Sequence, residues 1–326
     1  MGSHALNNIP ASEPEPAESR QEARLSWNHH FEYWAAKGLL GFLGAIPHPV
    51  ARRICSLLGA LSYWLWPRLR RTGLWNLQLA YPEWSARERR RVLFGSFQNL
   101  GRMLADFAQF PRLDRASIGG LIVYDGFEHF ENARRKGKGA LFLTAHFGAW
   151  ELGSFAHGIY GYPVNFVARK LDNPLIDSLI NRYRCLSGGK PIDKAEFARP
   201  ALRALRRNEP VGILMDQNMM LAEGVFVDFF GRPASTTASP ARVAQKTGAA
   251  IILGLVIWDS GLGKYRLRFE NVEWISRLDP GEEILVNTGN FTRILERYIR
   301  QYPEQWLWVH RRWKTRPPGE APLYPF

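Results

Sequence analysis

The sequence predicts an α/β protein in which a mainly parallel or mixed central sheet is flanked by helices. The chain has 326 residues, of which 46% are hydrophobic, so it can bury a full core. From about residue 120 onward, short apolar runs alternate with segments of helical periodicity. That alternation is typical of a sheet covered by helices. A hydrophobic stretch precedes it, which predicts an additional N-terminal helical segment.

The alternating part of the chain gives the expected order of elements. We predict strands where short apolar runs are bounded by turn residues, and helices where apolar residues recur with helical spacing. The expected strands are 121–124, 139–145, 163–168, 211–215, 250–258, 264–272 and 306–310. The expected helices are 127–136, 149–159, 173–186, 195–207, 238–247 and 282–301.

The first 70 residues fall into two parts by composition. Residues 1–24 are rich in Pro, Ser and Glu without periodicity, which predicts a disordered leader. Residues 25–70 hold two apolar runs, 31–43 and 54–66, separated by a Pro-His-Pro break. The second run has 13 residues. It is therefore shorter than the roughly 20 residues that span a bilayer.

Charges between the two apolar runs argue against a single spanning helix. Joining the runs would bury Arg52 and Arg53, which costs about 3 kcal/mol for each at the centre of a bilayer. We therefore expect a membrane-binding helical hairpin that lies in the membrane surface or dips into it, with aromatic ends and basic anchors. A hydrophobic helix packed on the protein's own core is the alternative.

A further helix is expected over 85–110. Ser85 and Glu88 have the spacing of a capping box, and apolar residues recur on one side of the following turns. The arginines of this segment fall mainly on other sides. They predict a solvated face, with contact to anionic lipid as the alternative.

Composition favours a membrane surface as the partner. The formal net charge is +13 and the chain has 12 tryptophans. A basic protein attracts polyanions, and tryptophan settles where an apolar layer meets water. Nucleic acid is less favoured, because no RNP-like strand, zinc knuckle or helix-turn-helix pattern is found. Cys55 and Cys185 lack metal-ligand spacing, so no metal site is expected.

His146 and Glu151 are the two residues that indicate a particular chemistry most specifically. His146 closes an apolar run, and Glu151 follows five positions later inside an expected helix. In one regular helix their side chains would lie roughly 140° apart. If Phe147-Gly148 instead forms a strand-to-helix turn, Glu151 can reach back, fix the imidazole tautomer and help His146 take a proton from an alcohol. A capping histidine beside an ordinary first-turn glutamate is the alternative.

Six blocks resemble, in the same order, the lipid A biosynthesis lauroyl/myristoyl acyltransferase family. Within them, His146-x4-Glu151 resembles the His-x4-Asp/Glu motif of glycerolipid-type acyltransferases, which implies a glycerolipid-acyltransferase-like fold. The resemblance covers about residues 35–317. A Phe-Pro-Glu-Gly element is missing, which argues against a simple lysophosphatidate acceptor. The blocks are RTGLWNLQLAYPEWS, TAHFGAWELG, VARKLDNPLID, GILMDQN, VDFFGRPASTTASPARVAQKTGAAI and YPEQWLWVHRRWKTRP.

The resemblance implies transfer of a fatty acyl chain from acyl carrier protein to a hydroxyl of a lipid A precursor, with no cofactor. It implies a peripheral or monotopic protein on the cytoplasmic face of a bacterial inner membrane, with a catalytic domain over 71–317 and a tail over 318–326. His146 would be the base and Glu151 its orienter. The same chemistry on another acceptor, such as a phosphoinositol mannoside, an ornithine lipid or another glycolipid, stays open. So does a non-catalytic lipid-binding protein.

Other polar residues follow expected strands and are candidate substrate contacts. Arg169 could bind a phosphate or the acyl donor, because a guanidinium binds oxyanions in a bidentate manner. Asp216 and Gln217 follow the strand at 211–215, so we place them near the acceptor. Arg232 could bind headgroup oxygens. Ordinary surface or turn roles are the alternatives for all four, and we expect His310 to be a packed structural histidine.

Overall fold

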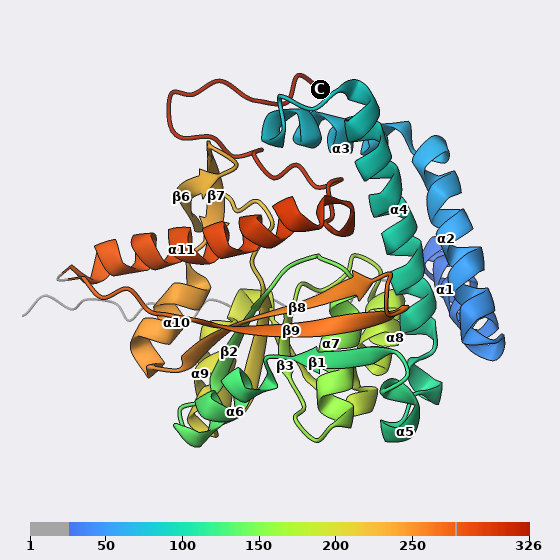
Figure 1. Ribbon diagram of the computed structural model, residues 1–326, viewed down its shortest axis with the longest axis horizontal. Coiled ribbons are helices and arrows are strands. Elements are labelled where there is room, and N and C mark those ends of the chain that lie inside the picture. The colour runs from blue at the N-terminus through green and yellow to red at the C-terminus, as the bar shows by residue number, and fades with distance from the viewer. Residues whose placement is uncertain (1–25, 278) are drawn as a thin grey trace, which may run out of the picture.

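The computed structural model describes residues 26–277 and 279–326, so the leader predicted at 1–24 lies outside the described residues. Within this part of the chain, a seven-stranded sheet has the strand order β1-β9-β8-β2-β5-β3-β4. Neighbouring strands are parallel except β8 and β9, so the predicted mixed sheet is confirmed (Figure 1). The strands are β1 Ile122–Asp125, β2 Ala140–Thr144, β3 Asn165–Ala168, β4 Lys190–Asp193, β5 Pro210–Leu214, β8 Ala250–Asp259 and β9 Lys264–Val272.

Helices cover both faces of the sheet, because successive residues of its central strands point to opposite sides. In β2, Leu141 and Leu143 enter one core, whereas Phe142 enters the other. Figure 1 shows α11 above the sheet and α6 and α7 below it. The helices of the two layers are α6 Phe127–Arg135, α7 Trp150–Ile159, α8 Pro174–Arg184, α9 Ala198–Arg206, α10 Ser239–Thr247 and α11 Pro280–Gln301.

The N-terminal helices stand at one side of the sheet (Figure 1). The predicted capping box is confirmed, because Ser85 and Glu88 cap the helix that follows them. Packing against that helix is close: a Cβ on Gly101 would lie 1.9 Å from the carbonyl oxygen of Cys55, so only glycine fits there. The helices are α1 Trp27–Ala45, α2 His48–Leu65, α3 Pro67–Ala80, α4 Ala86–Ala108 and α5 Arg115–Ile118.

A buried carboxylate ties these helices to the sheet. Asp106 of α4 accepts hydrogen bonds from His48 and Arg52 at 2.7 Å each, and from the Tyr265 hydroxyl at 2.6 Å. Asp106 is fully buried, and a buried carboxylate needs such partners. The position of α2 is therefore fixed by α4 and β9 together.

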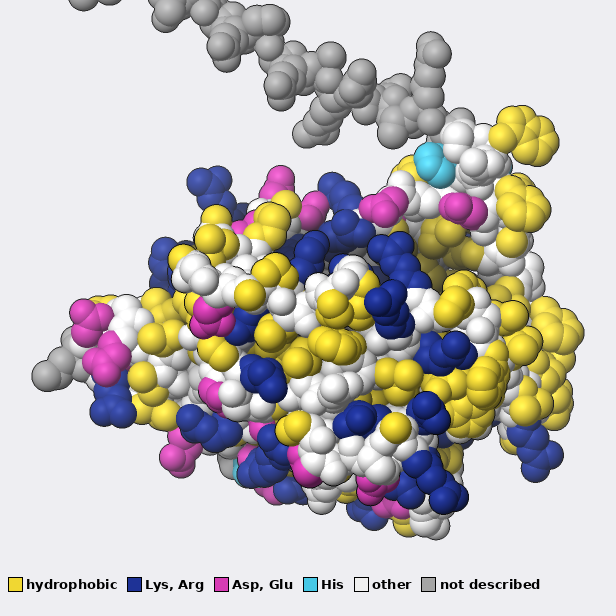
Figure 2. Space-filling view, turned by 90° about the horizontal axis from the view of Figure 1, so that it is seen from above, with side chains coloured by type: hydrophobic (Ala, Val, Ile, Leu, Met, Phe, Trp, Pro, Cys, Tyr) yellow, Lys and Arg dark blue, Asp and Glu magenta, His cyan; other side chains and the backbone are white. Residues whose placement is uncertain are grey.

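The two helices α1 and α2 bury only one side. The other side exposes large apolar residues, which gather at the right edge of the view in Figure 2. Among the described residues, no helix is both long and apolar enough to cross a membrane. We call this surface the apolar N-terminal face: Trp27, Phe31, Trp34, Phe42, Leu57, Leu61, Trp64, Leu65 and Trp66.

Two regions differ from the sequence prediction. The segment 306–310 is not a strand: it makes one isolated bridge, between Trp306 and Phe147, and then turns. Its alternating pattern arises instead from tryptophans that pack into the core. The sequence prediction also missed β4 and a separate hairpin formed by β6 Gly224–Phe229 and β7 Arg232–Thr237.

Candidate functional site

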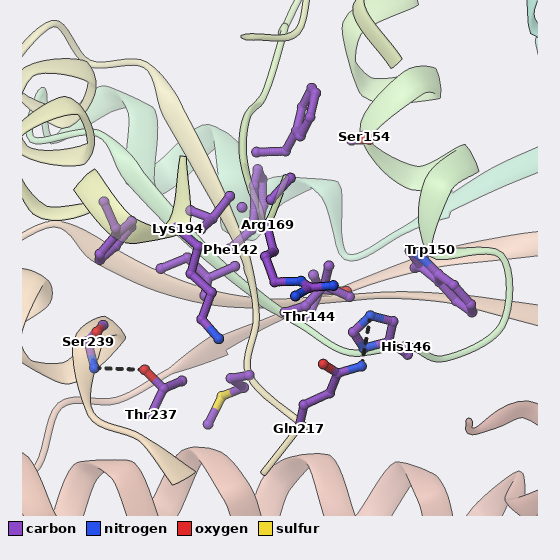
Figure 3. Close-up of a pocket in the computed structure, with 18 of the residues that line it drawn as sticks. Phe142, Thr144, His146, Trp150, Ser154, Arg169, Lys194, Gln217, Thr237 and Ser239 are labelled. Atoms are coloured by element: carbon purple, nitrogen blue, oxygen red, sulfur yellow. Dashed lines mark hydrogen bonds between the residues drawn. The ribbon is translucent and has the colours of Figure 1, made fainter. Parts of the chain in front are cut away.

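A cavity of about 1110 Å³ opens at the carboxyl ends of β2, β3 and β5. His146 lies in its wall, with 19% of the side chain exposed. The strand ends supply His146 and Gln217, and α7 and α8 close the cavity from the other side. Figure 3 shows Gln217 pointing toward His146, with Trp150 on the other side of the imidazole. The site lies where α/β sheets commonly bind their ligands.

The turn after His146 depends on glycine. Gly148 has a φ of 59°, and a Cβ there would lie 1.6 Å from the carbonyl oxygen of Val256. Its N–H donates to the Gln305 carbonyl at 2.8 Å. The predicted strand-to-helix turn at Phe147-Gly148 is therefore confirmed. It ends β2 just before His146 and lets α7 begin at Trp150.

Asp216, rather than Glu151, contacts the imidazole. Nδ1 of His146 lies 2.9 Å from Oδ1 of Asp216, and the His146 backbone N–H donates to Oδ2 at 3.1 Å. The Trp306 indole N–H also donates to Oδ2, at 2.8 Å. Because an ionised carboxylate only accepts hydrogen bonds, Nδ1 carries the proton and Nε2 keeps its lone pair. Nε2 lies 3.4 Å from the Gln217 amide nitrogen.

This arrangement shifts both pKa values. Burial by itself lowers the pKa of His146, but the charge and hydrogen bond of Asp216 outweigh it, so the pKa lies above its usual value. For Asp216, burial acts to raise the pKa, yet the imidazole charge and three hydrogen bonds hold it below the usual range. The carboxylate is thus ionised and stabilises the protonated form of His146.

Glu151 forms an ion pair with Arg184 and does not contact His146. Both of its oxygens accept hydrogen bonds from Arg184 of α8, at 2.8 and 2.5 Å. The expected contact of Glu151 with the imidazole is therefore corrected: from the first turn of α7, its side chain reaches toward α8. Glu151 still acts on His146 through space, because its charge raises the pKa of the histidine.

The remaining predicted residues separate into those at the cavity and those away from it. Arg169 lines the cavity mouth with 69% of its side chain exposed and pairs with Asp172 at 3.2 Å. Asp216 contacts the imidazole and does not itself line the cavity, so its place near the acceptor stays a prediction. Arg232 donates to the Leu79 carbonyl at 3.1 Å and is also not part of the cavity wall.

His310 has a structural role, as the sequence analysis predicted. Its Nε2 accepts the Asn218 backbone N–H at 3.1 Å. Burial lowers its pKa to about 4, so the ring is neutral near pH 7. It holds the loop that follows Gln217 rather than facing the cavity.

The inner part of the cavity is apolar and runs between the sheet and α7. Three of its lining residues are glycines from three different elements, which leaves room beside the larger side chains: Gly153, Gly212 and Gly254. Large apolar residues form most of the remaining inner wall, namely Phe142, Val164, Val256, Leu267 and Phe269. A long apolar group fits such a space, with its polar end near His146.

Comparison with known proteins identifies the family of the chain. The family model for bacterial lipid A biosynthesis acyltransferases matches residues 20–315. The chain belongs to this family. It is 28% identical over 292 residues to the lipid A biosynthesis lauroyltransferase of Escherichia coli, which covers 89% of this chain and 94% of that protein. The palmitoleoyltransferase of the same organism gives the same values, and its myristoyltransferase is 25% identical over 299 residues, or 90% and 91% of the two chains.

Sequence reasoning missed three parts of the site of this lipid A acyltransferase family member. Arg184 gave no signal, because its importance comes from the distant Glu151. Trp306 was part of an alternating pattern that predicted only a strand. The position of Asp216 could have been found: β2 and β5 pair in parallel with Thr144 opposite Leu214, so His146 and Asp216 each lie two residues beyond a paired position.

Proposed function

We propose that this acyltransferase moves a fatty acyl chain from acyl carrier protein to a hydroxyl of a lipid A precursor. The observation that supports this proposal most directly is the Asp216–His146 pair, whose imidazole lies in the wall of a large cavity with an apolar inner part. The family membership supports the acceptor class. The donor and the roles of individual residues are inferred from the chemistry of the site.

His146 acts as the general base. Nε2 takes the proton of the acceptor hydroxyl as its oxygen attacks the carbonyl carbon of the thioester. The carbon–sulfur bond then breaks, and the proton passes from the imidazolium to the thiolate that leaves. Asp216 stabilises the imidazolium during this sequence, because its carboxylate is buried against Nδ1.

Arg184 stabilises the negative charge that develops on the carbonyl oxygen. Its guanidinium lines the same cavity as His146, and 22% of its side chain is exposed. Hydrogen bonds to Glu151 fix its orientation, and a fixed guanidinium presents its remaining donors without reorganisation. Glu151 is thus a positioning residue for Arg184 rather than for the imidazole.

The apolar N-terminal face lies on the membrane that holds the acceptor. Exposed tryptophans and leucines there would meet water in a free protein, and a surface of this size marks a membrane or protein contact. The cavity wall continues toward this face: Leu171 lines the cavity, and Asn173, two residues later, donates to the His29 carbonyl of α1 at 3.0 Å. A lipid could therefore enter from the bilayer. The cytoplasmic face of a bacterial inner membrane is the proposed location.

The cavity mouth also carries basic groups that suit acidic partners. Arg169, Lys170, Lys194 and Arg242 all line it. Such a rim attracts anionic lipid headgroups and an acidic carrier protein. Gln217 lies next to Nε2, where the acceptor hydroxyl has to arrive, and is the proposed acceptor contact. Arg169 is the proposed contact for a phosphate, whereas Arg232 has no such place because it lies away from the cavity.

A radiolabelled acyl-transfer assay with membranes tests the chemistry. The His146→Ala variant should lose at least about a hundredfold in rate, the usual contribution of a general base. His129→Ala is the matched control, because His129 is partly exposed on α6 and does not line the cavity. Activity of the parent together with near-normal activity of His146→Ala would overturn the mechanism.

Vesicle sedimentation tests the membrane surface. Replacing Leu57 by Asp should weaken binding to vesicles that contain phosphatidylglycerol, because it places a charge on the apolar N-terminal face. Leu262→Asp is the control, since this leucine is exposed in the turn between β8 and β9. Equal loss of binding in both variants would contradict the assignment of the face.

A further inference from the structure

His157 is a buried polar residue in the cavity wall that the proposed acyl transfer does not use. His157 of α7 lines the inner cavity and is 1% exposed. Its Nδ1 lies 3.2 Å from the Tyr124 hydroxyl, whereas its Nε2 is buried without a hydrogen-bond partner. An unpartnered buried polar atom is unfavourable, and in the wall of a cavity a bound ligand can supply the missing partner.

Within the described residues, no side chain around His157 makes a hydrogen bond with its Nε2. Its ring is packed among aromatic rings, with centroid distances of 4.5 Å to Phe130, 5.3 Å to Phe142 and to Tyr162, and 5.4 Å to Phe269. Burial lowers its pKa to about 3, so the imidazole is neutral. A neutral ring in an apolar space can bind a hydroxyl, whereas a charged group would be strongly disfavoured there.

The position of His157 along α7 shows how far it lies from His146 inside the cavity. Trp150, Gly153, Ser154 and His157 line the cavity with the spacing of one helix face. Trp150 lies beside His146, with ring centroids 5.2 Å apart. Seven residues further along the helix, His157 is about 10 Å deeper. An acyl chain whose thioester lies at His146 therefore passes His157 with its distal part.

We propose that His157 is a specificity residue that selects an acyl chain carrying a hydroxyl on its distal part. Nε2 hydrogen-bonds that hydroxyl, so the hydroxylated donor is preferred over a plain chain of the same length. A phenylalanine or leucine at this position would fill the space without an unpaired ring nitrogen, although the Tyr124 hydroxyl would lose its contact with Nδ1. The inference rests on the proposed function, because the cavity must first bind an acyl chain.

Competition between donors tests this with the full-length protein. Three acyl carrier protein thioesters of equal chain length are compared: a plain saturated chain, one with a distal hydroxyl about 10 Å from the thioester, at the depth of His157, and one hydroxylated next to the thioester. We expect kcat/KM for the distally hydroxylated donor to exceed that of the plain donor about tenfold, which corresponds to about 1.4 kcal/mol. The donor hydroxylated near the thioester should show no such advantage.

Two variants assign the preference to the imidazole. His157→Leu should abolish the ratio between the two donors, and His157→Asn, which keeps a hydrogen-bonding side chain, should retain part of it. Ser154→Ala is the matched control on the same helix face, because the Ser154 hydroxyl already donates to the Glu151 carbonyl at 3.3 Å. It should leave the ratio unchanged.

The outcomes separate this inference from the proposed function. A ratio near one in the parent protein means that Nε2 binds only water and overturns the inference, whether or not the variants fold. A ratio that His157→Leu leaves unchanged overturns it as well. If the folded parent transfers none of the three donors, the proposed function itself fails.

Discussion

Replacing Asp216 by Asn is the sharpest perturbation of the site, because the change keeps the shape and removes the charge. Asp216 accepts hydrogen bonds from His146 Nδ1, from the His146 backbone and from Trp306. An asparagine has one acceptor oxygen, so at least one of these donors would face its amide group. The imidazole would lose its preferred tautomer and the stabilisation of its protonated form.

The expected magnitude follows from these contacts. In Ser-His-Asp triads the same exchange lowers kcat by about 10⁴, and we expect a fall of about 10³ or more here. A buried donor left unpaired costs about 1–3 kcal/mol, which should appear in the free energy of unfolding. The acyl-transfer rate and urea unfolding of purified Asp216→Asn measure the two effects.

The pH dependence of kcat/KM is an independent check, because the direction of the expected shift can be predicted. His146 must be neutral to act as a base, so kcat/KM rises as the pH passes its pKa in the free enzyme. Asp216 raises that pKa against the opposing effect of burial. Without the carboxylate, the pKa falls and the acidic limb of the profile moves to lower pH. An unmoved limb, or a variant with more than a tenth of the parent activity, would refute the role of Asp216.

Three further predictions concern other parts of the molecule. Glu151→Gln should lower kcat about 10²-fold by releasing Arg184, as for a lost oxyanion donor, and should move the acidic limb less than Asp216→Asn does; an equal or larger movement would make Glu151 the main partner of the histidine. Gly254→Val should shift donor preference to shorter chains, because a Cβ there meets aromatic rings at 3.4 and 3.6 Å, and unchanged chain lengths in a mixed-donor assay would contradict the acyl cavity. Asp106→Asn should lower the free energy of unfolding by about 3 kcal/mol, against no change for the exposed control Asp172→Asn, as measured by urea unfolding.

The sequence predicted elements well where the signal is local. Helix α4 was expected from the capping box of Ser85 and Glu88, and both contacts form as the spacing requires. The turn at Gly148 was expected for the same reason, because a φ of 59° favours glycine. The sequence signal in both cases comes from residues close together in the chain, although contacts with Val256 and Gln305 also restrict Gly148.

Elements that depend on distant partners were missed. The hairpin of β6 and β7 turns through Phe230 and Gly231, both with positive φ, and its polar second strand has little strand character in the sequence. Residues 306–310 have the alternation of a strand but no neighbour to pair with along their length. Trp306 instead donates its indole N–H to Asp216, which the sequence places 90 residues away.

The difference between local and distant contacts also explains which carboxylate reaches His146. Glu151 is close to His146 in sequence, but it begins α7 and extends to Arg184, whereas Asp216 reaches the imidazole because β2 and β5 are parallel neighbours. The two pairs are coupled through charge: Arg184 lowers the pKa of His146, and Glu151 raises it. Neutralising Glu151 therefore leaves a freed cation near the base. In the proposed mechanism, the five-residue spacing of His146 and Glu151 therefore links the base to the arginine that stabilises the oxyanion: Asp216 holds His146, and Glu151 holds Arg184.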